Sequence, residues 1–242
     1  MRTSLLLLLL SAQLHAGPLF LMLLQKPAVS STGGATITYL ASVSAALGIN
    51  GGSTSGINAT GGTAVVANLN YYSGAVSLTF NDSNGNTYTP LTAQTDTSSG
   101  VSRLYYCGNA TCGSGMTWTI GGTGVYASVE VTVYTKSSGA LTLDSQTGTT
   151  NVSSNTIQPG SLSTSGTATE LYVSGIESAD TAPGTTVDSS VTIRGNIQGS
   201  GGTNYGGAIG QGVTTGTTTI NPTWTNSSAG STGMAATAAF FK

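Results

Sequence analysis

The sequence predicts an all-β fold, a two-sheet antiparallel β-sandwich of jelly-roll type, and three observations lead to this prediction. Apolar residues alternate with Thr, Ser and Asn along most of the chain after about residue 35, which is the period of a half-buried strand. Turns that contain Gly or Ser separate these segments at intervals of roughly 8 to 15 residues. No segment beyond the leucine-rich N-terminus has the period of an amphipathic helix.

The first predicted strands lie between residues 35 and 91. Residues 35–45 and 65–71 each place apolar side chains on one face and polar side chains on the other. Residues 76–80 and 88–91 flank a polar turn that contains Asn84-Gly85. Because Asn-Gly readily adopts positive φ, we expect these two segments to form a tight hairpin.

The central strands are the most regular of the chain. Residues 104–106 and 116–120 are expected strands on either side of a short loop with two cysteines. Residues 125–134 alternate almost without exception, with valines on one face and Tyr126, Glu130 and Tyr134 on the other. This segment therefore predicts a strand with one apolar and one polar face.

The remaining predicted strands follow at similar spacing. They cover residues 141–143, the region of 157, and 170–176, 191–197, 205–213, 217–224 and 234–241. A total of about eleven or twelve strands favours one large jelly-roll-like sandwich over an immunoglobulin domain. We detect no internal repeat, and residues 146–165 are interpreted as a long surface connection. Residues 31–242 are therefore assigned to a single β-sandwich domain.

Residues 1–30 are interpreted as a signal peptide or a membrane anchor. Arg2 precedes an uninterrupted leucine run from Leu5 to Leu10, and Leu14 to Gly17 offers a cleavage site. A second apolar stretch follows, so residues 5–24 together are long enough to span a bilayer if the leader is retained. Either reading predicts a secreted protein or one displayed on the extracellular surface.

The composition excludes several function classes. His15, inside the leader, is the sole histidine, so neither a histidine-based hydrolytic triad nor a histidine metal site is expected. Charged residues make up 6% of the chain, and six Lys and Arg cannot form the basic patch that nucleic acid requires. We therefore expect no catalytic activity, no cofactor, no metal and no nucleic-acid partner.

Cys107 and Cys112 bracket a four-residue segment between two predicted strands. In an exported protein such a pair is expected to close the hairpin loop as a disulfide. The alternative is a pair of free thiols at the ends of neighbouring strands.

Tyr126, Glu130 and Tyr134 are the candidate ligand-binding residues. Two aromatic rings and one hydrogen-bond acceptor on one strand face suit a sugar ligand. The alternative is an ordinary solvent-facing surface with a half-buried tyrosine.

Two acidic clusters offer other functions. Asp82, Asn84 and Asn86 form either a plain Asn-Gly turn or a calcium site that lacks the bidentate glutamate of an EF-hand. Glu170, Glu177, Asp180 and Asp188 are the densest carboxylates, but Glu170 and Glu177 lie seven residues apart and point to opposite faces of one strand.

Several short motifs carry a resemblance. They are Ser55-Gly56-Ile57-Asn58, Asp82-Ser83 with Gly85-Asn86-Thr87-Tyr88, Arg103-Leu104-Tyr105-Tyr106-Cys107, Asn221-Pro222-Thr223-Trp224 and the final Ala-rich strand that ends at Lys242. From about Ala35 onward the chain resembles uncharacterised jelly-roll-like β-sandwich proteins seen in bacterial, phage and metagenomic sequences. The resemblance implies a surface or virion setting and transfers no catalytic residue.

The function expected from these observations is a secreted or surface-displayed, non-enzymatic module that is adhesive, carbohydrate-binding or structural, with glycans or surface proteins as partners. Two alternatives stay open. One is a structural or fibre protein of a phage virion, and the other is a glycan-cleaving enzyme that works with carboxylates alone.

Overall fold

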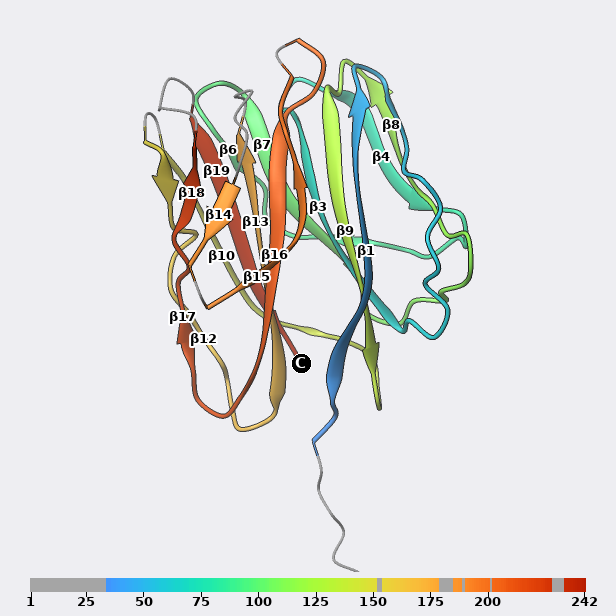
Figure 1. Ribbon diagram of the computed structural model, residues 1–242, viewed down its shortest axis with the longest axis vertical. Coiled ribbons are helices and arrows are strands. Elements are labelled where there is room, and N and C mark those ends of the chain that lie inside the picture. Colours follow the sequence, from blue (N-terminus) through green and yellow to red (C-terminus); the bar gives the residue numbers. More distant parts are fainter. Residues whose placement is uncertain (1–33, 152–153, 179–184, 189, 201, 228–232) are drawn as a thin grey trace, which may run out of the picture. The chain divides into compact units, whose positions relative to one another are not determined.

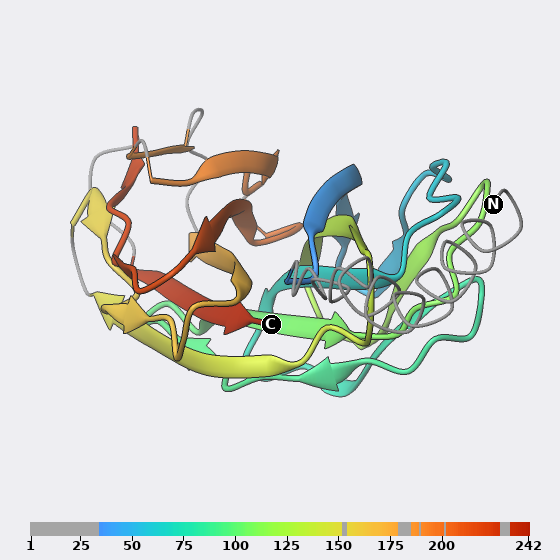
Figure 2. The same ribbon diagram turned by 90° about the horizontal axis from the view of Figure 1, so that it is seen from below.

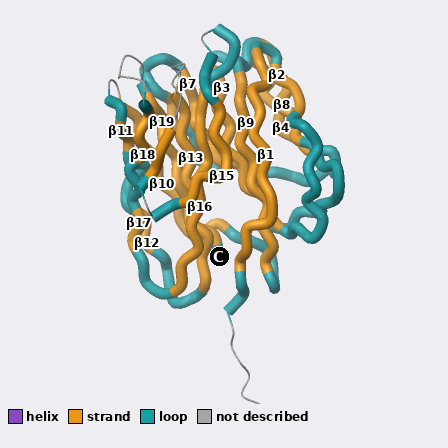
Figure 3. Tube along the Cα trace, in the orientation of Figure 1, coloured by secondary structure: helices purple, strands orange, loops and turns teal. Residues whose placement is uncertain are grey.

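The computed structural model describes residues 34–151, 154–178, 185–188, 190–200, 202–227 and 233–242. The predicted signal peptide or anchor, residues 1–30, lies outside these ranges. Residues from Ala35 to Lys242 form one compact unit. Every regular element in the described residues is a β-strand, so the all-β prediction is confirmed (Figure 3). In this described part no helix is long and apolar enough to cross a membrane.

The first half of the compact unit forms two antiparallel sheets. The N-terminal inner sheet has the order β1-β9-β3-β7-β5, with β6 also paired to β7, and the N-terminal outer sheet has the order β2-β8-β4. The strands of this half are β1 (Ile37–Gly48), β2 (Gly51–Ser53), β3 (Ala64–Tyr72), β4 (Val76–Asp82), β5 (Thr89–Pro90), β6 (Gln94–Thr95), β7 (Gly100–Cys107), β8 (Trp118–Thr123) and β9 (Ala127–Lys136).

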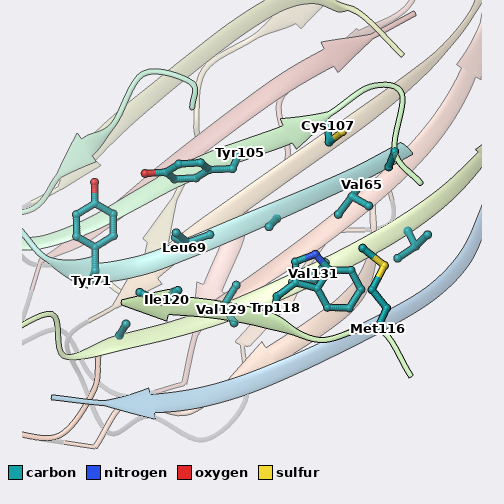
Figure 4. Packing of buried hydrophobic residues seen from close by; sticks show 14 of the residues in the cluster. Val65, Leu69, Tyr71, Tyr105, Cys107, Met116, Trp118, Ile120, Val129 and Val131 are labelled. Carbon is teal, nitrogen blue, oxygen red and sulfur yellow. The ribbon is translucent and has the colours of Figure 1, made fainter. Parts of the chain in front are cut away.

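The apolar face of the N-terminal inner sheet packs against the N-terminal outer sheet. Val65 and Leu69 on β3 belong to the same buried cluster as Trp118 and Ile120 on β8 (Figure 4). The alternation seen in the sequence of β3 therefore places every second side chain in this core. The intervening residues of β3 are buried as well, because a second sheet covers its other face.

The second half also forms an inner sheet with strands outside it. The C-terminal inner sheet has the order β10-β19-β13-β16-β15, and two small sheets, β11-β18-β14 and β12-β17, accompany it. The strands are β10 (Leu143–Asn151), β11 (Thr156–Ile157), β12 (Leu162–Ser163), β13 (Thr169–Ser178), β14 (Thr185–Val187), β15 (Thr192–Ile197), β16 (Gly206–Thr215), β17 (Thr219–Ile220), β18 (Trp224–Asn226) and β19 (Met234–Phe241).

The two halves share one strand order. The N-terminal inner sheet contains the run β1-β9-β3-β7, and the C-terminal inner sheet contains the run β10-β19-β13-β16. In both runs the first strand of the half pairs with the last strand of that half. In each outer three-stranded sheet β8 or β18 lies in the middle. This interleaved order, in which successive strands move between facing layers, is that of a jelly roll.

The chain therefore contains two jelly-roll modules, residues 37–136 and 143–241. The sequence had instead suggested one sandwich without an internal repeat. Trp118 opens β8 and Trp224 opens β18, so the two tryptophans of the chain occupy the same place in the two modules. Both are fully buried and both lie in the tripeptide Thr-Trp-Thr. Each indole N–H donates to a hydroxyl, of Tyr88 at 2.7 Å and of Ser174 at 2.9 Å respectively.

The two inner sheets pack against each other, with β15 and β16 beside β9 and β1 (Figure 1; Figure 2). Part of the interface is apolar and includes Leu104, Leu171 and Phe241. Another part is polar, and there glycines of the C-terminal inner sheet face side chains of the N-terminal inner sheet. A Cβ added at Gly175 would lie 2.4 Å from Cγ of Asn68, so only glycine permits this close approach.

Two local predictions are wrong. Asn84-Gly85 does form a turn, with Gly85 at φ 74°, but β4 and β5 belong to different sheets and do not form a hairpin. Residues 146–165 are not a surface connection, because they contain the end of β10 and all of β11 and β12. The connection between the modules is the shorter segment 137–142.

Candidate functional site

The structure buries two of the three predicted site residues. Glu130 and Tyr134 are 0% exposed, whereas Tyr126 is half-buried and immediately precedes β9. The expectation that these residues share a solvent-facing strand surface is wrong, because the C-terminal inner sheet covers that face of β9. Of the three, Tyr126 alone reaches the surface.

Glu130 lies in a polar network between the two inner sheets. Its carboxyl accepts hydrogen bonds from Nδ2 of Asn68 at 3.2 Å and from Nδ2 of Asn70 at 2.9 Å. The same amide of Asn68 donates to the carbonyl of Ile176 on β13 at 3.1 Å, so the network joins both modules. Burial raises the pKa of Glu130 to about 8, although the two asparagine hydrogen bonds lower it in part.

Tyr134 is part of the same interface and has a packing role. Its ring meets the ring of Tyr39 edge-on at 6.4 Å between centroids. The guanidinium of Arg194 lies 3.9 Å from the ring centroid of Tyr39 and extends this stack. The hydroxyl of Tyr134 is buried and has no hydrogen-bond partner among the residues that the structure describes, and burial raises its pKa.

Cys107 and Cys112 are free thiols, so the predicted disulfide is wrong. The prediction assumed a hairpin between the flanking strands, but β7 belongs to the inner sheet and the next strand, β8, to the outer sheet. The chain therefore leaves one layer at Cys107 and does not return along it. Burial raises the pKa of both thiols, that of Cys112 to about 11, which keeps them protonated and unreactive near neutral pH.

In the oxygen-rich turn at Asp82, both carboxylate oxygens accept hydrogen bonds from nearby residues of the chain. Oδ1 of Asp82 accepts from the backbone N–H groups of Asn84 and Asn86 at 2.9 and 3.1 Å. Oδ2 accepts from Nδ2 of Asn86 at 2.8 Å and from the hydroxyl of Tyr88 at 2.6 Å. These bonds explain the turn without a bound calcium ion. Elsewhere in the described residues no group of three or more His, Cys, Asp or Glu could hold a metal.

The three predicted carboxylates that the structure describes, Glu170, Glu177 and Asp188, do not converge. Glu170 accepts a hydrogen bond from the backbone N–H of Ser165 at 3.2 Å, at the start of β13. Glu177 lies near the other end of that strand. Asp188 accepts from the backbone N–H of Thr223 at 2.8 Å, next to β18. Asp180 falls outside the described residues.

Three tyrosines gather at one end of the molecule, the upper end in Figure 1, where β1 and β3 end and β9 and β16 begin. We call Tyr72, Tyr126 and Tyr205 the tyrosine rim. The rings of Tyr72 and Tyr126 meet edge-on at 6.0 Å, and the backbone N–H of Tyr205 donates to the carbonyl of Tyr126 at 2.9 Å. Tyr205 comes from the second module, so both modules build the rim.

Apolar side chains next to the rim are also exposed. Among the described residues five large hydrophobic side chains are exposed, and three of them, Ile49, Tyr72 and Val76, belong to this end. The carbonyl of Ile49 accepts from the backbone N–H of Tyr126, and Val76 opens β4 directly after the short connection that follows Tyr72. Grouped exposed apolar side chains are characteristic of binding surfaces.

The backbone under the rim is strained. Tyr126 has φ 48° and Ser99 has φ 67°, values that non-glycine residues rarely adopt. The backbone N–H of Ser73 donates to the carbonyl of Ser99 at 2.8 Å, and the hydroxyl of Tyr205 donates to the carbonyl of Ser98 at 3.0 Å. These bonds connect the β6–β7 turn to both neighbouring rim segments. Such local strain is most common at functional sites.

Two carboxyl groups lie beneath this turn. Oδ1 of Asp96 accepts from the backbone N–H groups of Ser98 and Gly100 at 2.9 and 2.7 Å and closes the turn. The carboxyl of Glu177 on β13 is packed against Gly100, since a Cβ at that position would lie 2.2 Å from its Oε1. Burial raises the pKa of both carboxyls, and Asp96 raises that of Glu177 further.

Tyr72, Tyr205 and the proximity of Glu177 to Asp96 were not predicted from the sequence. Tyr72 and Tyr126 share one signal that could have identified them, an aromatic residue where a strand meets a turn with glycine, in Tyr72-Ser73-Gly74 and in Gly124-Val125-Tyr126. The contact between Glu177 and the β6–β7 turn joins two modules, and nothing in the local sequence indicates it.

Comparison with protein families, with curated proteins and with solved structures finds no match for this chain.

Proposed function

We propose that this protein is a non-enzymatic, extracellular β-sandwich module that binds glycans through the tyrosine rim. The observation that carries the proposal is the meeting of three partly accessible tyrosines from two modules at one loop-bearing end. Tyrosine rings offer apolar faces for sugar C–H groups, and their hydroxyls hydrogen-bond to sugar hydroxyls. The rim residues carry no formal charge, so the proposed ligands are neutral glycans.

The proposal places the protein outside the cell. A leucine-rich leader in residues 1–30 directs export, and the low content of charged residues suits a surface whose polarity comes from hydroxyl and amide groups. Solvent-facing Thr, Ser and Asn also supply the hydrogen-bonding groups of an adhesive surface.

Glycan binding by the rim can be tested with single-ring deletions. Binding of the purified chain to an array of neutral glycans is compared among the parent, Tyr72→Ala and Tyr126→Ala. Loss of one stacking ring should weaken binding by roughly two- to tenfold, because an aromatic contact contributes roughly 0.5 to 1.5 kcal/mol beyond its buried area. Thermal melting should change little, since both rings are partly exposed.

Tyr39→Ala is the matched control. This ring is also half-buried, but it lies on β1 against Tyr134, away from the rim. Glycan binding should survive in this variant. Equal weakening in the control and in the rim variants, or unchanged binding in the rim variants, would refute the proposal.

A second candidate function is a structural protein of a virion. Its support is the tandem jelly roll, since jelly rolls build many viral capsids as well as lectins. This is an argument from fold alone and names no site. Assembly into regular particles or fibres, seen by electron microscopy of the purified chain, would favour it over glycan binding.

A further inference from the structure

The buried carboxyl of Glu177 lacks every partner that would stabilise its charge. The residue is 0% exposed, and neither Oε1 nor Oε2 has a hydrogen-bond partner among the described residues. Its neighbours in the sheet, Gly207 on β16 and Ala235 on β19, are uncharged. A carboxylate in such surroundings is costly, whereas the neutral acid is tolerated.

The turn above Glu177 holds the rim in place. The carboxyl is packed against Gly100, and Gly100 is tied to Asp96 by a backbone N–H to Oδ1 bond of 2.7 Å. The carbonyls of Ser98 and Ser99 in this turn accept from the hydroxyl of Tyr205 and from the N–H that follows Tyr72. Any movement of the turn away from Glu177 therefore disturbs two of the three rim segments.

The titratable groups that face Glu177 are Asp96, from the β6–β7 turn, and Tyr205, from the β15–β16 connection. Oδ2 of Asp96 is itself buried and has no hydrogen-bond partner in the described part of the chain. The described cations are engaged elsewhere: Arg103 with the carbonyl of Leu91, Lys136 with the carbonyl of Ala140, Arg194 with the ring of Tyr39, and Lys242 with Asp144. Ionisation of Glu177 would therefore place a second negative charge beside Asp96 without compensation.

We propose that Glu177 makes the tyrosine rim pH-sensitive: the protonated carboxyl lets the β6–β7 turn pack closed, and its ionisation opens the turn and loosens Tyr72 and Tyr205. The reaction is the loss of one proton to solvent. If the rim binds glycans, as proposed above, binding is strongest with Glu177 protonated and weakens as the pH rises. That last consequence rests on the proposed function, whereas the opening of the turn does not.

The sign of the effect follows from linkage. Burial, with a smaller contribution from Asp96, raises the pKa of Glu177 well above its ordinary value, so the closed turn binds this proton more tightly than the open turn. The closed state is therefore fully favoured in acid and is lost as the pH rises through the pKa of Glu177 in the closed state. Each pH unit within that window shifts the equilibrium by up to about tenfold.

The first test is direct titration of Glu177. The chain has three glutamates, so a protein labelled with ¹³C at the glutamate carboxyls has three carboxyl resonances. Glu177→Gln and Glu130→Gln assign them by loss of one resonance each. The midpoint for Glu177 is expected well above the ordinary value of a glutamate, and a midpoint that is not raised above that ordinary value would overturn the proposal.

The second test is amide hydrogen exchange of the full chain between pH 5 and pH 10, corrected for the intrinsic pH dependence of exchange. Protection in peptides that cover residues 96–100 and 202–205 should fall with rising pH, and Glu177→Gln should abolish this fall. The matched control, Glu130→Gln, removes another buried carboxyl that bonds to Asn68 and Asn70, and it should retain the fall.

The two proposals fail in different ways. An equal loss of protection in the parent and in Glu177→Gln, or constant protection in the parent, refutes the pH-sensitive turn whatever the array shows. A pH-dependent turn in a protein that binds no glycan supports the turn and refutes the proposed ligand.

Discussion

Replacement of Glu130 by glutamine should remove a strong pH dependence from the stability of the whole fold. Glu130 is buried between the two inner sheets, and its pKa in the folded chain is about 8. In the unfolded chain the ordinary value of 4.5 applies. The folded state therefore binds this proton more tightly, so the stability is full below about pH 4.5 and falls as the pH rises towards 8.

The magnitude follows from the two pKa values. A difference of one pKa unit corresponds to about 1.4 kcal/mol, so between pH 5 and pH 8 the ionisation of Glu130 should reduce the free energy of unfolding by roughly 3 to 4 kcal/mol. Glutamine keeps the shape of the side chain, and a carbonyl in the place of Oε2 still accepts from Nδ2 of both Asn68 and Asn70, but its amide in the place of Oε1 then meets the amide of Asn70. The cost of that contact is independent of pH and does not affect the slope.

The assay is urea unfolding of the parent and of Glu130→Gln at half-unit steps from pH 5 to pH 8, with the difference in free energy of unfolding plotted against pH. As the pH rises, the free energy of unfolding of the variant should increase relative to that of the parent. The reasoning would be refuted if the free energies of unfolding of the two proteins had the same pH dependence. It would also be refuted if the variant gained stability relative to the parent as the pH falls.

Three further predictions concern other parts of the core. Trp118→Ala should reduce the free energy of unfolding by roughly 3 to 5 kcal/mol in urea unfolding, because the indole is fully buried; a loss below 1 kcal/mol would contradict its place in the core. Asp82→Ala should lower the melting temperature through the loss of four hydrogen bonds, whereas added calcium should leave the parent's melting temperature unchanged; stabilisation by calcium would contradict the turn described above. Alkylation without reductant should label both Cys107 and Cys112 once the chain is unfolded, and Cys107 slowly or not at all before; an unlabelled unfolded chain would show a disulfide after all.

Much of the fold could be predicted from periodicity alone. Residues 125–134 became β9, and the segments around Val65 and Phe80 became β3 and β4, because alternation of apolar and polar residues reports directly on strand faces. The pairing of strands could not be predicted in the same way. The Asn84-Gly85 turn joins two sheets, and its local chemistry does not distinguish this from a hairpin.

The polar faces were misread for a physical reason. Asn68, Asn70 and Glu130 read as a solvent surface because polar side chains are usually exposed. In the folded chain they satisfy one another and backbone carbonyls of the second module, so they are buried at a tolerable cost. The repeated Thr-Trp-Thr is a local sign of the second module, but the sheet that covers this face is visible only in the folded chain.

The row of glycines at the module interface has a consequence for the history of the chain. β3 and β13 hold the same place in their modules, yet Asn68 on β3 fits into the space left by Gly175 on β13. Two copies of the first module could not meet in this way, because an asparagine would collide with an asparagine. Two copies of the second would leave a void there. If one ancestral module was duplicated, its descendants have become complementary halves that are no longer exchangeable, and a further substitution on either side constrains the residue opposite.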